Sequence, residues 1–379
     1  MKILHIMNIH PRFTDDTVAL YNQYFNNGEH EICYLNKGDS SVIKKYFSIT
    51  QHEIFINSLS RFNLNIAKEI NNFIFSYDYI VLHGFIIDEL PTAYFYYLFA
   101  RNRFLSKLVW IEWGIDLYDF KLESRSVKSL INYLLIKKIK NNVKMVVGIF
   151  PPDVEVYKNK FPNSKALVMY APYFGLDEYM QYHNYSSYSR LKDAQEKSED
   201  IYIQIGHNAQ KQLNHIETLK VLSKFHNENI KIVIPLNYGD KNGYANKVEK
   251  VAKELFNEKT IILKDYLPQK EYFELINRVD IAVFGTYRQT GLSNIYNMIN
   301  NNVKLFMFDN SVMYDYFNSI DIPVMKIEDI QNMSFEEFIK PIDYSKYEGP
   351  QKLINWLMNN DERIIYWKNI YNKLREING

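Results

Sequence analysis

Short apolar runs alternate with longer helix-like segments along most of the chain. In residues 1–172 the apolar runs are KILHIMN, YDYIVLHGF, KLVWIEWG and VKMVVGIF, and the segments between them include DTVALYNQYFNN and PTAYFYYLFARNRFL. Alternating strands and helices are typical of a parallel sheet covered by helices on both faces. The pattern therefore predicts a first α/β unit over residues 1–172.

The polar stretch that follows, DEYMQYHNYSSYSRLKDAQEKSED, lacks a clean apolar stripe and predicts a linker over residues 173–200. The alternation then resumes, with strands predicted at IYIQIG, IKIVIPL, TIILKDY, VDIAVFG and VKLFMF and helices such as HIETLKVLSKFHN and YANKVEKVAKELFN between them. This second α/β unit covers residues 201–348. Residues 349–379 are predicted to be helical, and packing against the first unit is one arrangement for them.

Two Rossmann-like α/β units with a linker and terminal helices describe the glycosyltransferase B architecture, and also some dehydrogenases and periplasmic binding proteins. A dinucleotide enzyme should carry Gly-x-Gly-x-x-Gly after a strand, and this sequence has no such motif. A periplasmic protein needs an export signal, and MKILHIMNIH is too short and too polar for one. Because ligands bind beyond the carboxyl ends of parallel strands, we expect these ends of the two units to face one cleft.

Composition and charge exclude further classes of protein. A net charge of +1 gives no strong field toward nucleic acid, so no nucleic-acid partner is expected. Cys33 is the single cysteine and cannot form a disulfide within the chain, which suits a reducing cytoplasm. No apolar run reaches the roughly 20 residues of a membrane span, so we expect a cytoplasmic protein whose membrane contact, if present, is peripheral.

One segment has the composition of a membrane-surface helix. In RSVKSLINYLLIKKIKNNVK, cations surround an apolar Leu/Ile stripe, and such a stretch can lie on anionic lipid. A core-packed helix with solvated lysines is the alternative, and the pattern alone slightly favours it. The cations are Arg125, Lys128, Lys137, Lys138, Lys140 and Lys144.

Two strand-to-helix corners of the second unit have the chemistry of a phosphate site. In IQIGHNAQKQLNH, Gly206 permits a sharp turn before a helix N-terminus, where backbone N–H groups attract anions. Lys211 adds charge there, and either Asn208 or Asn214 is predicted to cap the helix. An ordinary connecting loop is the alternative for this corner taken alone.

The second corner is VFGTYRQTGLSNIYNMI, in which Arg288, Gln289 and Thr290 precede Gly291 and a helix. The planar guanidinium of arginine binds two phosphate oxygens at once, so the two corners together favour a pyrophosphate site over a solvated loop. Tyr238, in the loop after IVIPL, is a candidate for stacking on a nucleotide base.

The first unit carries candidates for acid–base chemistry where two of its predicted strands end. VLHGF ends with His83 and Gly84, and IEWGIDLYDF places further polar and aromatic residues after the next strand. Imidazole and carboxylate groups at such ends can move protons. A hydrogen-bonded structural histidine and a helix cap are the alternatives for His83 and Asp116. The sequence has neither a Cys/His cluster nor a clear Asp-x-Asp, so we expect no metal.

The segments HG, WGIDLY, IG…K…H, IPLNY and RQTG occur in this order, and in this the sequence resembles the bacterial glycosyltransferase family 56. The likeness runs to about residue 343 and is clearest from His83 onward. The resemblance implies the B architecture and transfer of 4-acetamido-4,6-dideoxygalactose (Fuc4NAc) from a dTDP donor to a lipid-linked disaccharide at the inner face of the cytoplasmic membrane. The chain departs from the family pattern at Glu112, Asn208 and Asn214 and in its N-terminal loop, which leaves the reaction class intact and the sugars open.

Together these observations predict a metal-independent glycosyltransferase that uses no cofactor and takes a nucleotide diphosphate sugar as its substrate. A nucleotide-sugar epimerase, which needs no acceptor, and a non-catalytic sugar-nucleotide-binding protein are the rival functions. Either Asp116 or His83 is predicted to be the base. The residues predicted to bind the donor are Gly206, Asn208, Lys211, His215, Tyr238, Arg288, Gln289, Thr290 and Gly291, and those on the acceptor side are Gly84, Glu112, Trp113, Gly114 and Tyr118.

Overall fold

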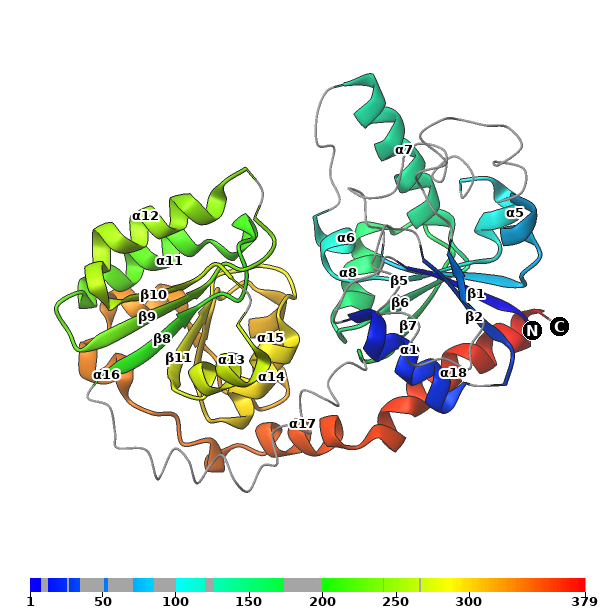
Figure 1. Ribbon diagram of the computed structural model, residues 1–379. Coiled ribbons are helices and arrows are strands. Elements are labelled where there is room, and N and C mark those ends of the chain that lie inside the picture. Colours follow the sequence, from blue (N-terminus) through cyan, green and yellow to red (C-terminus); the bar gives the residue numbers. More distant parts are fainter. Residues whose placement is uncertain are drawn as a thin grey trace. The chain divides into compact units, whose positions relative to one another are not determined.

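The computed structural model describes residues 1–7, 13–25, 27–34, 51–53, 71–84, 100–119, 126–173, 200–240, 242–265 and 267–378. The chain divides into two compact units, one formed by Met1–Leu176 with Asn359–Gly379 and the other by Asp177–Met358 (Figure 1). Each unit is an α/β domain built on a parallel sheet, so the predicted fold class is confirmed.

The described strands of the first unit form a parallel sheet in the order β3-β2-β1-β4-β5-β6-β7. These strands are β1 (Ile3–Met7), β2 (His30–Tyr34), β3 (Gln51–Glu53), β4 (Tyr79–His83), β5 (Leu108–Ile111), β6 (Met145–Gly148) and β7 (Leu167–Tyr170). The described helices are α1 (Phe13–Tyr24), α5 (Asn102–Leu105), α6 (Ile115–Tyr118), α7 (Val127–Asn142), α8 (Asp153–Lys160) and the C-terminal α18 (Asn360–Asn378).

Apolar side chains on both faces explain why the central strands of this sheet read as continuous apolar runs. One face packs under α5, α6, α7 and α8, around the buried Trp110. The other face packs under α1 and α18. The terminal helix is fixed there by Trp367, whose indole N–H donates to Pro172 O at 2.9 Å, and by Tyr79, whose hydroxyl donates to Leu374 O at 2.9 Å.

The described strands of the second unit form a parallel sheet in the order β10-β9-β8-β11-β12-β13. These strands are β8 (Ile201–Ile205), β9 (Ile230–Pro235), β10 (Thr260–Leu263), β11 (Val279–Phe284), β12 (Lys304–Met307) and β13 (Met325–Lys326). The helices are α11 (His215–Leu222), α12 (Tyr244–Phe256), α13 (Gln269–Ile276), α14 (Leu292–Asn300), α15 (Val312–Ser319), α16 (Phe335–Ile339) and α17 (Gly349–Met358). Short 3₁₀ turns lie at η2 (Lys211–Leu213), η3 (Ser223–Phe225), η4 (Asn257–Lys259), η5 (Ile327–Asn332) and η6 (Tyr344–Lys346).

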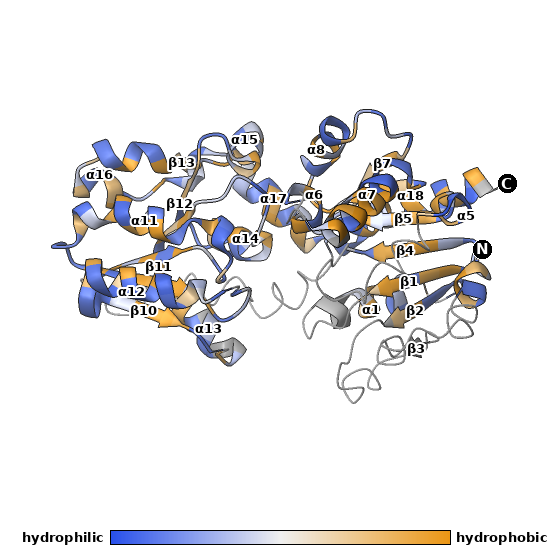
Figure 2. Cartoon of the chain, turned by 90° about the horizontal axis from the view of Figure 1, so that it is seen from above, coloured by the Kyte–Doolittle hydropathy of each residue, from blue (hydrophilic) through white to orange (hydrophobic). Residues whose placement is uncertain are grey.

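Helices α11, α12 and α16 cover one face of this second sheet. Apolar residues concentrate in the strands and polar residues on the outer helix surfaces (Figure 2). The predicted terminal segment 349–379 is divided between the units, because α17 packs against α14 while α18 packs on the first sheet. Among the helices that the structure describes, none has the length and apolar character to cross a membrane.

Candidate active site

The corner between β8 and α11 is built around a glycine, as the sequence indicates. Gly206 has φ +62°, and its N–H donates to Val283 O of the neighbouring strand at 2.9 Å. A Cβ at this position would lie 2.8 Å from the Nε2 atom of His215, so only glycine fits without a shift of that ring. The chain then turns into His207 and Asn208, both of which are buried.

The loop after β11 meets this corner at His207. Thr290 Oγ1 lies 3.2 Å from His207 Nε2, and Asn208 Nδ2 lies 2.9 Å from the same nitrogen. Gly291 is the N-cap residue of α14 with φ +62°, and a Cβ there would lie 2.8 Å from His207 Nδ1. The second glycine therefore allows the two loops to touch, which brings Thr290 and Gly291 beside Asn208.

Arg288 is buried in this junction just before α14. Its Nη2 donates to Gln210 Oε1 at 2.5 Å and its Nη1 to Gln289 O at 3.1 Å. Both acceptors are neutral oxygens, so these two bonds orient the guanidinium without cancelling its charge. A positive side chain and the N-terminus of a nine-residue helix thus lie together where two central strands end, which is favourable for a phosphate group.

Neither of the two asparagines predicted to cap α11 does so through its side chain. Asn214 is the N-cap residue, but its side-chain amide donates to Gly285 O at 2.7 Å and makes no cap hydrogen bond. Asn208 Oδ1 instead accepts from Gln210 N at 2.9 Å, inside the loop. Both asparagine side chains therefore stabilise the loops after β8 and β11. Backbone groups of these loops bind the side chains that would otherwise cap the helix.

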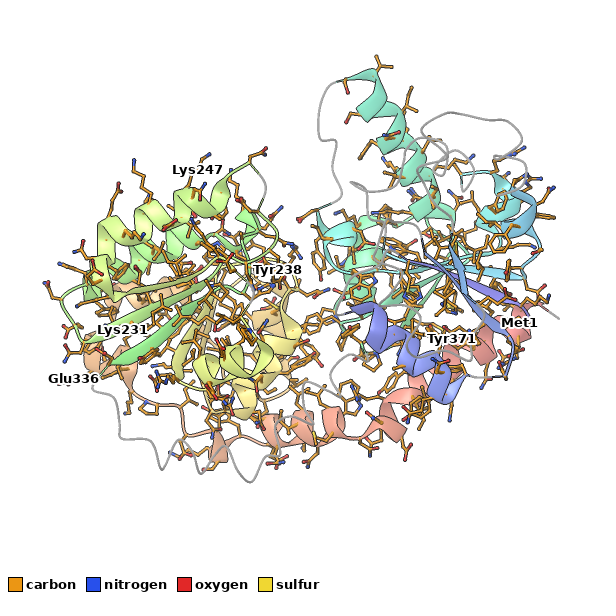
Figure 3. All side chains as sticks on the ribbon, viewed as in Figure 1. Met1, Lys231, Tyr238, Lys247, Glu336 and Tyr371 are labelled. Atoms are coloured by element: carbon orange, nitrogen blue, oxygen red, sulfur yellow. The ribbon has the colours of Figure 1, made fainter. Side chains whose placement is uncertain are left out.

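The remaining donor-side candidates lie at different depths. Tyr238 follows β9, is 37% exposed, and has its ring centroid 6.3 Å from that of His207 (Figure 3). Lys211 is exposed in η2. His215 is fully buried beneath Gly206, and burial lowers the pKa of its imidazole to about 4, partly opposed by the backbone of Asn208. The placement makes His215 a support for the corner, since its ring fills the space beneath Gly206.

In the first unit, the candidate residues lie at the carboxyl ends of two adjacent strands. Gly84 follows β4 with φ +79°, and its N–H donates to Ile111 O at the end of β5 at 2.9 Å. Gly114, with φ +77°, follows β5 and begins α6. His83, the last residue of β4, is thereby held beside the loop that carries Trp113, and burial lowers the pKa of His83 to about 3.

Asp116 holds its own loop together. Its Oδ1 accepts from Trp113 N at 2.8 Å and its Oδ2 from the indole N–H of Trp110 at 2.7 Å, and the residue is almost fully buried. Its backbone oxygen accepts from the ammonium of Lys140. The carboxylate therefore closes the 113–116 turn, and the helix-cap alternative does not apply because α6 has no side-chain cap.

Glu112 is completely buried beneath the same loop. Its Oε2 accepts from Gly114 N at 2.7 Å and its Oε1 from Ile149 N at 3.1 Å. Burial and the neighbouring Asp153 raise the pKa of Glu112 well above its ordinary value, and the two carboxyl groups share a hydrogen bond. Tyr118 donates to Asp153 Oδ1 at 2.6 Å. Glu112 and Tyr118 thus stabilise the loop that was predicted to lie on the acceptor side.

The structure corrects the interpretation of the basic segment at Lys140. This lysine is fully buried, and its ammonium lies 4.7 Å from the ring centroid of Trp110. Burial lowers its pKa to about 7. A lysine that donates to Asp116 O inside the unit cannot contact lipid. Arg125 lies outside the described residues, as does the side chain of Lys128, while Lys137 and Lys138 are exposed on α7.

Sequence reasoning missed four residues. In the second unit these are His207 and Gln210, which contact Asn208 and Arg288. In the first unit these are His5, which contacts His83, and His30, which contacts His5. His207 directly follows Gly206, so its position after a strand-ending glycine was an available signal. The contact of Gln210 with Arg288 joins residues that are 78 positions apart and has no local signal.

Comparison with known proteins agrees with this geometry. Residues 59–340 match the model of the family described as 4-alpha-L-fucosyltransferase glycosyl transferase group 56. The fold is similar to that of Anabaena HepE, solved in complex with UDP and glucose (TM-score 0.66, 13% identity, 99% of this chain and 100% of that one). It is also similar to a glycosyltransferase of Rickettsia africae (TM-score 0.62, 15% identity, 98% of each chain) and to WaaG, a glycosyltransferase of lipopolysaccharide biosynthesis (TM-score 0.60, 12% identity, 97% and 98%). The chain belongs to glycosyl transferase group 56 and is a glycosyltransferase with the two-domain B fold.

Proposed function

We propose that this glycosyltransferase moves Fuc4NAc, or a related amino or deoxy sugar, from a dTDP donor to a lipid-linked glycan in the synthesis of a cell-surface polysaccharide. The observation that carries the proposal is the junction of Arg288 and His207 at the N-terminus of α14. The family match supports sugar transfer, and the resemblance of the sequence motifs supports this donor and acceptor.

In the proposed mechanism, the second unit binds the diphosphate of the donor. As the bond between the anomeric carbon and the diphosphate breaks, negative charge grows on the leaving group. Arg288 and the α14 N–H groups are oriented before the reaction, so they stabilise this charge without reorganising. Tyr238 stacks on the base of the nucleotide.

The acceptor hydroxyl attacks the anomeric carbon, and its proton must go to a base. We assign this role to His83, because both oxygens of the alternative, Asp116, already accept hydrogen bonds within their own loop. Burial holds the pKa of His83 at about 3, so the imidazole is neutral at pH 7 and has a lone pair to offer. Gly84 and Trp113, on the adjoining strand ends, form the acceptor side.

Peripheral attachment at the inner face of the cytoplasmic membrane is proposed through α7, which extends away from the first sheet (Figure 1). Its amino-terminal half exposes an apolar stripe of Val127, Leu130, Ile131 and Leu134. Residues at i, i+3, i+4 and i+7 share one face of a helix, and Lys137 and Lys138 follow them. Such a face suits the boundary between acyl chains and anionic headgroups.

The test is a thermal-shift screen with dTDP, UDP and GDP, followed by measurement of dTDP release from dTDP-Fuc4NAc with and without a lipid-linked disaccharide. A nucleotide present at about 100 times its Kd should stabilise the protein by roughly 2.7 kcal/mol. Arg288→Ala should reduce this shift to about half or less, while the matched control Arg278→Ala, at an exposed arginine of the same unit, should retain it. Absence of any nucleotide-dependent shift, or conversion of the donor sugar without an acceptor, would overturn the proposal.

A further inference from the structure

Three histidines from three different strands form a continuous hydrogen-bonded row inside the first unit. His5 Nδ1 lies 3.0 Å from His83 Nε2, and His5 Nε2 lies 2.9 Å from His30 Nδ1. All three are buried. The strand register explains the row, since β1 lies between β2 and β4 and the three side chains point to the same face of the sheet.

Aromatic rings from two helices enclose this row. Tyr21 of α1 lies against His5, with ring centroids 4.2 Å apart, and Tyr371 of α18 lies against His30, with centroids 4.7 Å apart. The two tyrosine hydroxyls are 2.5 Å apart, and Tyr371 is labelled in Figure 3. The row therefore runs from His83, at the carboxyl end of β4, to His30, at the amino end of β2, through an apolar environment.

Among the described residues, the charged groups that act on the row lie at its His30 end. Glu29 precedes His30 and pairs with the N-terminal ammonium at 3.1 Å and with Arg375 Nη2 at 2.5 Å. The Glu29 carboxylate raises the pKa of His30, while burial, Arg375 and the N-terminus lower it, to about 4 overall. His5, in the middle, has its pKa lowered well below the ordinary value by burial and by the two neighbouring rings.

Hydrogen-bond chemistry restricts such a row of neutral rings to two states. Each bond contains one proton, so the protons lie either all on Nε2 or all on Nδ1. In the first state His83 donates to His5, His5 donates to His30, and Nδ1 of His83 carries a free lone pair. In the second state every donor and acceptor is reversed, and Nδ1 of His83 carries a proton.

We propose that His5 and His30 are positioning residues that hold His83 in the Nε2–H state and relay the proton that it takes from the acceptor. The inference rests on the proposed function of His83 as the base. The acceptor proton binds to Nδ1 of His83. The Nε2 proton of His83 then passes to Nδ1 of His5, the Nε2 proton of His5 passes to Nδ1 of His30, and His30 holds the extra proton as an imidazolium near the Glu29 carboxylate. After the product leaves, the same transfers run in reverse, Nδ1 of His83 returns the proton to solvent, and the row is again in the first state.

Burial gives this relay a physical reason. A positive charge fixed on His83 inside the unit is costly, as the depressed pKa of this residue indicates. Transfer along the row moves the charge toward the Glu29 carboxylate at the other end. Within the described residues, Nε2 of His30 is buried and has no hydrogen-bond partner, so it keeps its own proton while Nδ1 receives the proton from His5.

Substitution of His5 separates the relay from a structural role. The amide of His5→Gln can accept from His83 and donate to His30, but it cannot pass a proton on, whereas His5→Phe removes both hydrogen bonds. We expect His5→Gln to lower kcat by at least about tenfold, with donor KM within about twofold of wild type and an unchanged melting temperature. His83→Gln should lower kcat by about 10²-fold or more. The exposed His226 supplies the matched control, and His226→Gln should leave kcat unchanged.

Wild-type kcat in His5→Gln, with a loss only in His5→Phe, would overturn the relay, because it would show that hydrogen bonding alone is required. Nitrogen-15 NMR of the imidazoles gives a second readout that needs no activity. The relay requires the proton of His5 on Nε2 at pH 7, and a proton on Nδ1 would overturn it. Failure of the wild-type protein to transfer sugar would instead refute the proposed function, and the NMR result would still report the state of the row.

Discussion

Gly291 gives the sharpest test of the donor site. It is the N-cap residue of α14 and has φ +62°. In Gly291→Ala, the added Cβ would lie 2.8 Å from His207 Nδ1 and 3.0 Å from its Cε1 and Cγ atoms. A contact under 3.0 Å to a buried ring requires a shift, so Gly291→Ala should disturb the contacts of His207 with Thr290 and Asn208.

The substitution has a matched control in Gly243, which is the N-cap residue of α12 with φ +69° and has nothing within 4 Å of its Cβ position. Both alanines occupy the left-handed region, which costs about 1–2 kcal/mol. At about 2–4 °C per kcal/mol for a domain of this size, both variants should melt roughly 2–8 °C below wild type. Strain is therefore common to the two variants, and displacement of His207 occurs only in Gly291→Ala.

Isothermal calorimetry with dTDP measures the difference. If the displaced loop loses one charge-assisted hydrogen bond to the diphosphate, about 1.5–3 kcal/mol of binding is lost. The Kd should then rise by about 10- to 150-fold in Gly291→Ala and stay at the wild-type value in Gly243→Ala. Equal affinities in the two variants would refute the assignment of this junction to the diphosphate, whatever the loss of stability.

Three further outcomes are expected. Gln210→Ala, which removes a partner of Arg288, should weaken dTDP binding by about 1 kcal/mol, or roughly fivefold, while the exposed Gln212→Ala should not change it in the same titration. Glu112→Gln should lose about 1 kcal/mol at pH 5.5, because a backbone N–H loses its acceptor. Because the pKa of Glu112 is raised in the folded protein, the stability of the wild type falls as pH rises toward that pKa. The difference in melting temperature between the wild type and Glu112→Gln should therefore close by pH 9. A difference that stays constant with pH would contradict this. Leu134→Glu on α7 should reduce sedimentation with anionic liposomes, whereas Ile365→Glu, at an equally exposed residue of α18 (53% and 52%), should not.

The sequence predicted the two α/β units well because their central strands are buried on both faces. β1, β4, β5 and β6 in the first unit, and β8 to β12 in the second, coincide with the apolar runs. The strands β2, β3, β7 and β13 were missed. HEICY of β2 begins with two polar residues, β3 is the polar QHE, and β13 is two residues long, so none of these three produces an apolar run. The sequence LVMY of β7 is apolar but only four residues long, at the edge of the sheet.

The glycines of the proposed donor site could be predicted from the sequence, but its contacts could not. Gly206 follows an apolar run and Gly291 precedes a helix, and both have the positive φ of a turn glycine. The collision that makes each glycine necessary involves a ring reached only through folding, His215 in one case and His207 in the other. Residue type and spacing carry no information on such tertiary contacts.

Burial affects the pKa of His83 and of His215 in the same direction, but the two rings differ in their hydrogen-bond partners. Burial lowers the pKa of both, to about 3 and about 4, so both are neutral at pH 7. Within the described residues, neither ring nitrogen of His215 has a hydrogen-bond partner that meets normal geometry, and its ring fills the space under Gly206. His83 has His5 at 3.0 Å, and through it a path for a proton. A depressed pKa therefore does not distinguish the structural His215 from His83, the proposed base. The distinction rests on the contact of His83 with His5, which offers a path for a proton.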